Sequence, residues 1–301
     1  MLPPPSWCQP YRYDWHDGRM PDGLGTKTSA LAKTTALERN LEELGAVVVA
    51  YSGGIDSATL AAVAHQVLGS AALAVTAVSP SLARRELADA SELARRFEWA
   101  HQIVRTYEGD REEYARNEAD RCYWCKSELF DVLGPIAKAR GAHVAVGTNL
   151  DDLGDYRPGL RAASERNVVT PLANAGFTKQ DVRALAARLG LPTAEKPASP
   201  CLASRFAYGV RVTAEGLDRV DLAEETLRSF GFTVFRVRDH GDLARIEVQP
   251  EEIERAASLR EELSAALREL GFSYVALDLS GFRSGAMNEV LPTPTLRNGS
   301  G

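Results

Sequence analysis

Cysteine, long apolar runs and basic residues are all scarce in this sequence, and each scarcity excludes a class of protein. Four cysteines among 301 residues are too few for a disulfide scaffold, so we expect reduced thiols. No run of about 18 apolar residues is present, which excludes a membrane-spanning chain. Asp and Glu (41) outnumber Lys and Arg (35), and the net charge of −6 disfavours a nucleic-acid partner.

The rest of the composition is that of a globular protein. Apolar residues make up 45% and charged residues 25% of a chain long enough for about two domains. Residues 1–11 lack the basic segment and apolar core of a signal peptide, so a cytoplasmic location is expected. Residues 1–34 contain Cys8, several prolines and aromatic residues but no periodicity, which predicts a flexible N-terminal arm.

Residues 35–200 alternate short apolar runs with amphipathic stretches. The apolar runs predict strands at 46–51, 73–78, 102–107, 143–146 and 168–172. The amphipathic stretches predict helices at 35–44, 57–68, 81–97, 111–120, 126–140 and 178–189. Thr178 and Asp181 stand in capping-box position at the start of the last helix. Strands without a polar face, alternating with helices, indicate an α/β fold whose parallel sheet is covered on both faces.

A second unit follows a proline-rich stretch. Pro192, Pro197 and Pro200 interrupt the helical pattern, and we place the domain boundary within residues 195–212, dividing the chain into 35–200 and 201–290. The pattern then predicts a helix from Thr213 to Gly231, strands at 233–238, 243–248 and 274–279, and a helix at 251–270. This string predicts a small α+β domain, followed by a flexible tail at 291–301.

The sharpest motif is SGGIDS, which lies between a predicted strand and a predicted helix. Gly53 and Gly54 let backbone N–H groups approach phosphate oxygens, and the hydroxyls of Ser52 and Ser57 add donors at the helix N-terminus. Asp56 cannot bind phosphate directly, so its expected role is to ligate Mg²⁺ that neutralises a pyrophosphate. An ordinary glycine-rich turn is the alternative, and the Walker A and Rossmann patterns are absent.

Three cysteines form a second group. Cys122 and Cys125 are spaced for chelation in the string RCYWCK at the start of a helix, and Cys201 lies in the irregular stretch before the second domain. Structural zinc needs a fourth ligand, which the five histidines do not offer by spacing. A four-iron four-sulfur cluster held by three cysteines would keep one iron open for a ligand such as sulfide. Buried CxxC thiols and an unrelated Cys201 are the third possibility.

Charged residues near these motifs are further candidates. The string GTNLDDLGDYRPG at 147–159 places carboxylates after a predicted strand, where they bind Mg²⁺, orient a nucleophile or form a solvated turn. Arg236 and Arg238 alternate with apolar residues, so both guanidinium groups leave one face of a strand and could bind a phosphate. Glu224, on the preceding helix, lies within plausible reach of them, and a salt-bridged sheet face is the alternative.

Taken together, these strings resemble one family. SGGIDS resembles the PP-loop of the N-type ATP pyrophosphatases, which adenylate a substrate oxygen. With RCYWCK, GTNLDDLGDYRPG, SPCLASRFAYGVRVT and RVRDHGDLARIEV in this order, residues 41–287 resemble the LarE family. Its members are pyridinium-3,5-biscarboxylic acid mononucleotide sulfurtransferases, which build the nickel-pincer nucleotide of lactate racemase.

The resemblance implies a two-step reaction that uses ATP and Mg²⁺. A substrate carboxylate is adenylated with release of pyrophosphate, and a cysteine-borne sulfur then displaces AMP to give a thiocarboxylate. One branch of the family sacrifices the sulfur of a single cysteine, at the position of Cys201, and converts it to dehydroalanine. Another branch holds an iron–sulfur cluster on three cysteines. Cys122, Cys125 and Cys201 match that branch, so the resemblance favours a 4Fe-4S cluster recharged by a sulfide donor.

The resemblance also implies where the ligands bind. The nucleotide would contact the SGGIDS loop, the backbone from Ala77 to Ser79, and the turn at Gly147 and Thr148, at the carboxyl ends of parallel strands. The anionic mononucleotide would need a cationic pocket. The residues assigned to the substrate are Arg236, Arg238, Arg205, Ser204, Lys126, Glu224, Asp152, Asp155 and Arg157. Family members form rings, so a homo-oligomer is expected, with the small domain as a reasonable interface.

Three other functions fit parts of this pattern. A PP-loop tRNA thiolase also combines adenylation with cysteine sulfur, but the acidic charge and the missing basic arm disfavour it. An amide-forming synthetase would have no use for three cysteines. A non-catalytic ATP-binding regulator or iron–sulfur carrier would not release AMP and pyrophosphate when given the substrate.

Overall fold

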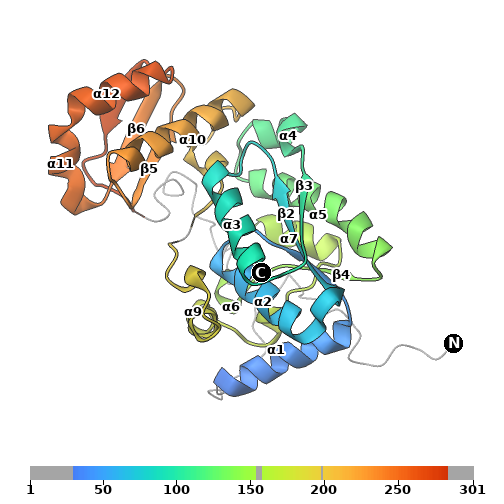
Figure 1. The fold of residues 1–301 in the computed structure, drawn as a ribbon. Coiled ribbons are helices and arrows are strands. Elements are labelled where there is room, and N and C mark those ends of the chain that lie inside the picture. The colour runs from blue at the N-terminus through green and yellow to red at the C-terminus, as the bar shows by residue number, and fades with distance from the viewer. Residues whose placement is uncertain (1–29, 154–157, 198, 284–301) are drawn as a thin grey trace, which may run out of the picture.

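Two sheets organise the chain, a parallel one of four strands and a smaller one of three strands. The computed structural model describes residues 30–153, 158–197 and 199–283. Figure 1 shows the smaller sheet in a lobe of its own beside the larger lobe. The larger sheet has the order β3 (His101–Arg105), β2 (Ala72–Val78), β1 (Val47–Ala50) and β4 (His143–Ala145). Every neighbouring pair in it is parallel, which confirms the predicted α/β fold.

Both faces of the parallel sheet are buried. Val47 and Val49 pack into one core and Val48 into the opposite core, because successive strand residues point to opposite faces. The first core includes α1 (Ala30–Leu44), α2 (Ile55–Leu68), α3 (Arg84–Arg96) and α9 (Lys179–Arg188). The second includes α5 (Arg121–Ala139) and α7 (Pro158–Glu165). Helices on both faces explain why β1 carries no polar position.

The smaller lobe is an α+β unit, as predicted. Its strands are β5 (Phe235–Asp239), β6 (Leu243–Val248) and β7 (Tyr274–Leu277). β5 and β6 are antiparallel, and β6 and β7 are parallel. Its apolar core also takes side chains from α10 (Ala214–Ser229), α11 (Ile253–Ser258) and α12 (Arg260–Glu269). Phe235 and Val237 point into this core, which leaves Arg236 and Arg238 on the other face of β5.

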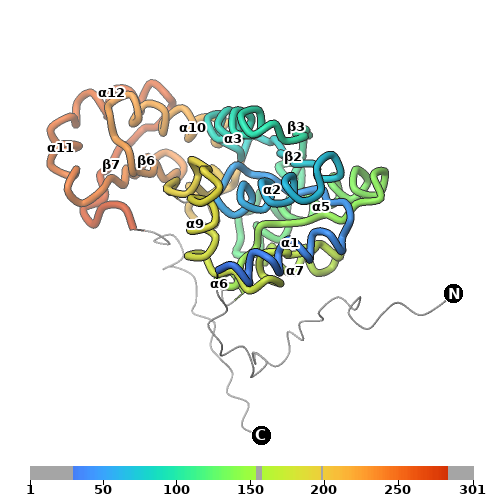
Figure 2. Tube along the Cα trace, turned by 60° about the horizontal axis from the view of Figure 1, so that its bottom comes forward, coloured from blue at the N-terminus to red at the C-terminus, as the bar shows by residue number. Residues whose placement is uncertain are grey.

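The two lobes meet at α10. Figure 2 shows α10 beside α3, and Arg84 of α3 forms ion pairs with Asp218 and Asp221 of α10. A separate apolar cluster includes Tyr114 from the first lobe, Leu202 and Phe206 from the connecting segment, and Leu217 of α10. The division at residue 200 stays a prediction, and the connecting segment packs against both lobes.

Short elements complete the described chain. They are the helices α4 (Glu112–Ala115), α6 (Leu150–Leu153) and α8 (Pro171–Asn174), and the 3₁₀ turns Gly69–Ala71, Glu108–Asp110, Pro192–Ala194, Leu202–Arg205 and Pro250–Glu252. No helix in the described ranges is long and apolar enough to cross a membrane.

Two predicted elements are wrong. The fifth strand at 168–172 is reduced to one parallel bridge between Val169 and Ala145, because Pro171 lacks an N–H group and begins α8 instead. The helix at 111–120 is reduced to α4. Asn117 has a φ of 56°, in the left-handed region, and this conformation interrupts helical geometry.

Other helix boundaries shift. α1 begins at residue 30 instead of 35, and α5 begins at Arg121 instead of Lys126, so both CxxC cysteines are helical. The helix predicted at 251–270 is divided at Leu259 into α11 and α12. The capping box is confirmed, since the Thr178 hydroxyl accepts from the Asp181 N–H and the Asp181 carboxylate accepts from the Thr178 N–H.

A substitution at Gly147 tests how closely the segment after β4 approaches the first turn of α2. A Cβ at Gly147 would lie 2.7 Å from the carbonyl carbon of Asp56 and from the nitrogen of Ser57. We expect Gly147→Ala to lower the free energy of unfolding by about 1–3 kcal/mol, because backbone must move. Urea denaturation measures this change. The matched control is Gly134→Ala in α5, where a Cβ meets nothing within 4 Å and which should be neutral or stabilising. Equal effects of the two substitutions would contradict this account.

Candidate active site

The turn between β1 and α2 has the geometry of an anion-binding loop. Gly53 has a φ of 74°, and a Cβ there would lie 2.8 Å from the Cβ of Ala90, so glycine is required. The Ser57 hydroxyl donates to the Gly54 carbonyl at 3.0 Å and accepts from the Ser52 N–H at 3.2 Å. These bonds shape the turn around the start of α2, where the helix dipole favours an anion.

Asp56 is bound by two side chains that the sequence analysis missed. Lys179 forms an ion pair with one carboxylate oxygen of Asp56, and the Asn149 side-chain amide donates to the other at 3.1 Å. Asn149 lies in the GTNLDDLG string, and Lys179 directly follows the Thr178 cap of α9. Their positions next to motifs were visible in the sequence, but their contact with Asp56 is tertiary.

The acidic loop after β4 is organised by its own carboxylates. Asp152 accepts from the Asn149 N–H at 3.1 Å, and Asp151 accepts from the Lys179 N–H at 2.8 Å. These bonds position Asn149 and Lys179 beside Asp56. Asp155 and Arg157, which were assigned to the substrate, lie outside the described residues.

The other predicted nucleotide contacts lie at the same edge of the sheet. Ala77 is near the carboxyl end of β2, and Gly147 and Thr148 follow the carboxyl end of β4. β1 lies between these strands, so all three segments surround the SGGIDS turn. Beyond β2, the hydroxyls of Ser79 and Ser81 both donate to the buried carboxylate of Glu108, which the sequence analysis did not single out.

The structure brings the three cysteines into one electrostatic neighbourhood. Cys122 and Cys201 are exposed and Cys125 is half-buried. Although the Cys122 side chain is accessible, desolvation by the surrounding protein raises the pKa of its thiol, the Arg121 charge lowers this pKa, and the nearby Cys201 raises it again. Burial also raises the pKa of Cys125, against the charge of Lys126 and with a further increase from Cys201. Cys201 therefore acts on both CxxC thiols.

The three cysteines do not form a site for a single metal ion within the described residues. Among the described residues, no three histidine, cysteine or acidic side chains converge closely enough to hold a single metal ion. Structural zinc needs four such ligands around one ion.

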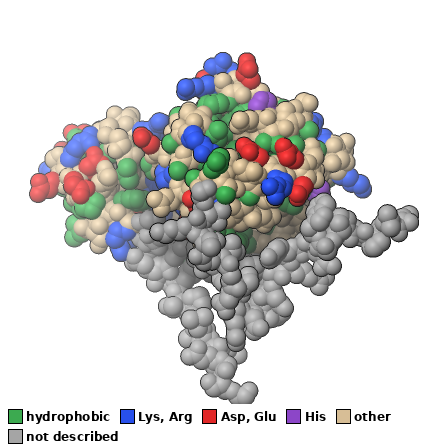
Figure 3. Space-filling model, turned by 90° about the horizontal axis from the view of Figure 1, so that it is seen from below, with side chains coloured by type: hydrophobic (Ala, Val, Ile, Leu, Met, Phe, Trp, Pro, Cys, Tyr) green, Lys and Arg blue, Asp and Glu red, His purple; other side chains and the backbone are tan. Residues whose placement is uncertain are grey.

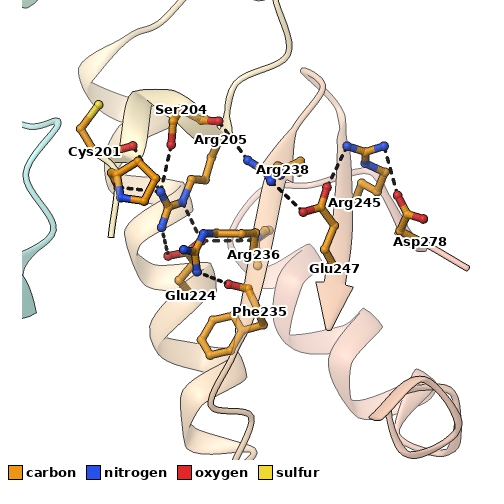
Figure 4. A network of polar contacts seen from close by, with 12 residues as sticks. Cys201, Ser204, Arg205, Glu224, Phe235, Arg236, Arg238, Arg245, Glu247 and Asp278 are labelled. Carbon is orange, nitrogen blue, oxygen red and sulfur yellow. Dashed lines mark hydrogen bonds and ion pairs between the residues drawn. The ribbon is translucent and has the colours of Figure 1, made fainter. Parts of the chain in front are cut away.

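Residues 200–210 form the turn that carries Cys201, here called the Cys201 turn. Four residues assigned to the substrate hold it in place, namely Ser204, Arg205, Glu224 and Arg238 (Figure 4). Arg205 forms two hydrogen bonds to Glu224, at 2.9 and 3.0 Å, and donates to the Pro200 carbonyl at 2.7 Å. Arg238 donates to Glu247 at 2.7 Å and to the Ser204 carbonyl at 3.1 Å. Arg205 and Arg238 are 2% and 6% exposed. Glu224 thus pairs with Arg205, and both arginines are engaged within the protein.

Arg236 has a different environment. It donates to the Phe235 carbonyl at 2.6 Å and lies over the ring of Phe282, with 5.0 Å from its guanidinium carbon to the ring centre. Burial, then the neighbouring charges of Arg205 and Arg238, lower the pKa of Arg236 to about 10. Cations that destabilise one another in this way favour an added anion. Lys126, the remaining assigned residue, is exposed on α5 beside the CxxC cysteines.

The fold and the loop define the class of the protein. Its residues 33–130 match the family described as asparagine synthase, which places the SGGIDS turn in an ATP-using PP-loop domain.

On the face seen in Figure 3, basic and acidic side chains are intermixed, without the basic stripe typical of nucleic-acid binding.

Whole-chain comparisons identify the family. The chain is 40% identical over 266 residues to pyridinium-3,5-bisthiocarboxylic acid mononucleotide synthase of Lactiplantibacillus plantarum, covering 86% of this chain and 95% of that protein. It is 47% identical over 264 residues to an uncharacterised protein of Synechocystis, covering 86% and 98%. A Methanocaldococcus jannaschii protein, also uncharacterised, is 30% identical over 258 residues, covering 84% and 98%. The chain belongs to the LarE family, an ATP-using, sulfur-transferring branch of the PP-loop proteins.

Lys179 provides a test of the nucleotide site. When Mg²⁺ binds Asp56, the ammonium group of Lys179 can turn to the phosphates, so we expect Lys179→Met to weaken Mg·ATP binding by about tenfold. Isothermal titration calorimetry measures the affinity. The matched control is Lys33→Met. Lys33 of α1 forms another lysine–aspartate pair, in which its ammonium nitrogen lies 2.6 Å from a carboxylate oxygen of Asp181, a residue of the same helix as Lys179. Unchanged or tighter binding in Lys179→Met would mean that this lysine only competes with Mg²⁺ for Asp56.

Proposed function

We propose that this enzyme converts pyridinium-3,5-biscarboxylic acid mononucleotide to its thiocarboxylate, using ATP and a cysteine-held sulfur, in nickel-pincer nucleotide biosynthesis. The observation that carries the proposal is that the CxxC helix contacts the segment that carries Cys201, in a chain that also has the PP-loop turn: Arg121 donates to the Ala203 carbonyl at 2.9 Å, and Cys125 packs against the cluster that contains Leu202. The likeness to a bisthiocarboxylic acid mononucleotide synthase supports the choice of substrate.

The first step is adenylation. A carboxylate oxygen of the substrate attacks the α-phosphorus of ATP, the bond from this phosphorus to the bridging oxygen breaks, and pyrophosphate leaves with the electron pair. The SGGIDS turn would bind the phosphates, and Asp56 would hold Mg²⁺ against the pyrophosphate. Lys179 and the N-terminus of α2 would add positive charge where the leaving group gains negative charge.

The second step is sulfur insertion. A hydrosulfide-level sulfur attacks the carbonyl carbon of the acyl adenylate, the bond to the AMP oxygen breaks, and the new thiocarboxylic acid loses its proton to solvent. Cys122, Cys125 and Cys201 would hold a 4Fe-4S cluster, which when bound supplies this sulfur as an added sulfide. Lys126 and Arg121 place positive charge beside the thiolates that such a cluster requires.

The cationic face of the second lobe fits the anionic substrate. Arg236 would bind the substrate phosphate, since burial and the charges of two neighbouring guanidinium groups outweigh those of Glu224 and Glu247 and lower its pKa. Arg205 and Arg238, with Glu224 and Ser204, would keep the Cys201 turn beside this phosphate site. The substrate would then stand between the nucleotide and the sulfur.

A turnover experiment tests the proposal. The protein is reconstituted anaerobically with iron and sulfide, then given ATP and the biscarboxylate mononucleotide. We expect more than one thiocarboxylate per chain with the mass of Cys201 unchanged, and no product from Cys122→Ala or Cys201→Ala. At most one product per chain, with Cys201 lighter by the mass of hydrogen sulfide, would show that Cys201 gives up its own sulfur and that no cluster supplies it. Absence of any thiolated product would refute the proposed reaction.

Arg236 gives a test of substrate recognition. We expect Arg236→Met to raise the KM for the mononucleotide by about tenfold or more, because a charge-assisted contact to phosphate is lost. The nucleoside that lacks the phosphate should be used equally by the variant and the unmodified enzyme. The matched control is Arg228→Met, which removes an arginine packed on the neighbouring Phe235 ring from the α10 side. Equal losses with both substrates would exclude phosphate recognition by Arg236.

A further inference from the structure

The Cys201 turn depends on side chains for its shape. Residues 200–210 contain one short 3₁₀ turn and a single bridge, from Phe206 to Asp239, so regular secondary structure fixes little of their shape. Side-chain donors supply further hydrogen bonds. Arg238 of the second lobe donates to the Ser204 carbonyl, and Arg205, within the turn and paired with Glu224 of the second lobe, donates to the Pro200 carbonyl.

Asn117 donates hydrogen bonds to the same turn from the first lobe. Its side chain is fully buried, and its amide nitrogen donates to the Ala207 carbonyl at 2.8 Å and to the Val210 carbonyl at 3.0 Å. Both N–H groups of one amide are thus used on the turn. The left-handed backbone of Asn117, with φ at 56°, ends the preceding helical turn.

Arg121 connects this contact to the cysteine helix. It is 8% exposed, donates to the Ala203 carbonyl at 2.9 Å, and hydrogen-bonds the side-chain oxygen of Asn117. Arg121 is also the first residue of α5 and directly precedes Cys122. One continuous chain of hydrogen bonds therefore runs from the CxxC helix through Arg121 and Asn117 to the turn that carries Cys201.

We propose that Asn117 and Arg121 are positioning residues for the sulfur chemistry, which hold Cys201 at a fixed separation from Cys122 and Cys125. The inference rests on the proposed function for its purpose and on the hydrogen bonds for its geometry. A three-thiol site assembled from two distant segments works only if the two segments keep a fixed position relative to each other, since small displacements of reacting or ligating groups strongly lower activity. The Asn117–Arg121 pair fixes this relative position from the side of the CxxC helix.

Thiol cross-linking tests the positioning directly, without ATP, substrate or metal. The reduced full-length protein is treated with a bifunctional bromobimane, and the fraction of Cys201 linked to Cys122 or Cys125 is measured by peptide mass spectrometry. We expect this fraction to fall by about tenfold in Asn117→Gly and Arg121→Met, because each loses hydrogen bonds to the turn. Glycine adopts the left-handed backbone of Asn117 freely, so that variant removes the amide alone. Arg121→Lys, which can still reach one carbonyl, should recover part of the linkage.

Controls separate positioning from folding and from function. Arg111→Met is a matched control, because Arg111 also pairs with α5, through Glu128 at 2.7 Å, but forms no hydrogen bond to the described residues of the Cys201 turn. This variant should leave the linkage unchanged. Mg·ATP binding should persist in every variant, because the nucleotide turn is built from other elements. Wild-type linkage in Asn117→Gly and Arg121→Met, or no linkage in the unmodified protein, would overturn the inference. A protein that cross-links as expected but makes no thiocarboxylate would refute only the proposed function.

Discussion

The segment that carries Cys201 joins two sheets and belongs to neither, so side chains as well as its own backbone turns must fix its shape, and this imposes a constraint on the rest of the structure. Its carbonyl groups accept hydrogen bonds from the guanidinium groups of Arg121 in the first lobe, Arg238 in the second lobe and Arg205 within the segment itself. A buried guanidinium needs a carboxylate or several acceptors in turn. Glu224 and Glu247 meet this need for Arg205 and Arg238, so the ion pairs of the second lobe follow from the shape of one turn.

This constraint gives an acidic protein a local concentration of positive charge. The chain has a net charge of −6, yet several arginines gather where β5 and β6 face the Cys201 turn. The carboxylates offset most of these charges, and the lowered pKa of Arg236 reflects burial together with the repulsion that remains. A site of this kind attracts a small anion by local field while the protein as a whole repels polyanions.

Local signals in the sequence were sufficient for much of the fold. The apolar strands, the SGGIDS turn and the capping box at Thr178 each depend on residues close together in the chain, and each is present. The fifth strand was wrong because the missing N–H of Pro171 outweighed an apolar run. The contact of Lys179 with Asp56 and the burial of Arg205 against Glu224 were beyond sequence reasoning, since both join segments brought together only by the tertiary fold.

The arrangement also bears on how the intermediate of the proposed reaction would survive between its two steps. An acyl adenylate would be lost to water unless sulfur reached it promptly, so the proposed reaction requires the nucleotide edge and the Cys201 turn to be held together. Ser81, just beyond the end of β2, accepts the Leu202 N–H at 2.9 Å with its carbonyl, and its hydroxyl binds Glu108. Ser79, at the predicted adenine contact, binds the same carboxylate. The residue after Cys201 is therefore tied by hydrogen bonds to the strand end where the nucleotide is expected, which couples the positions of the two steps.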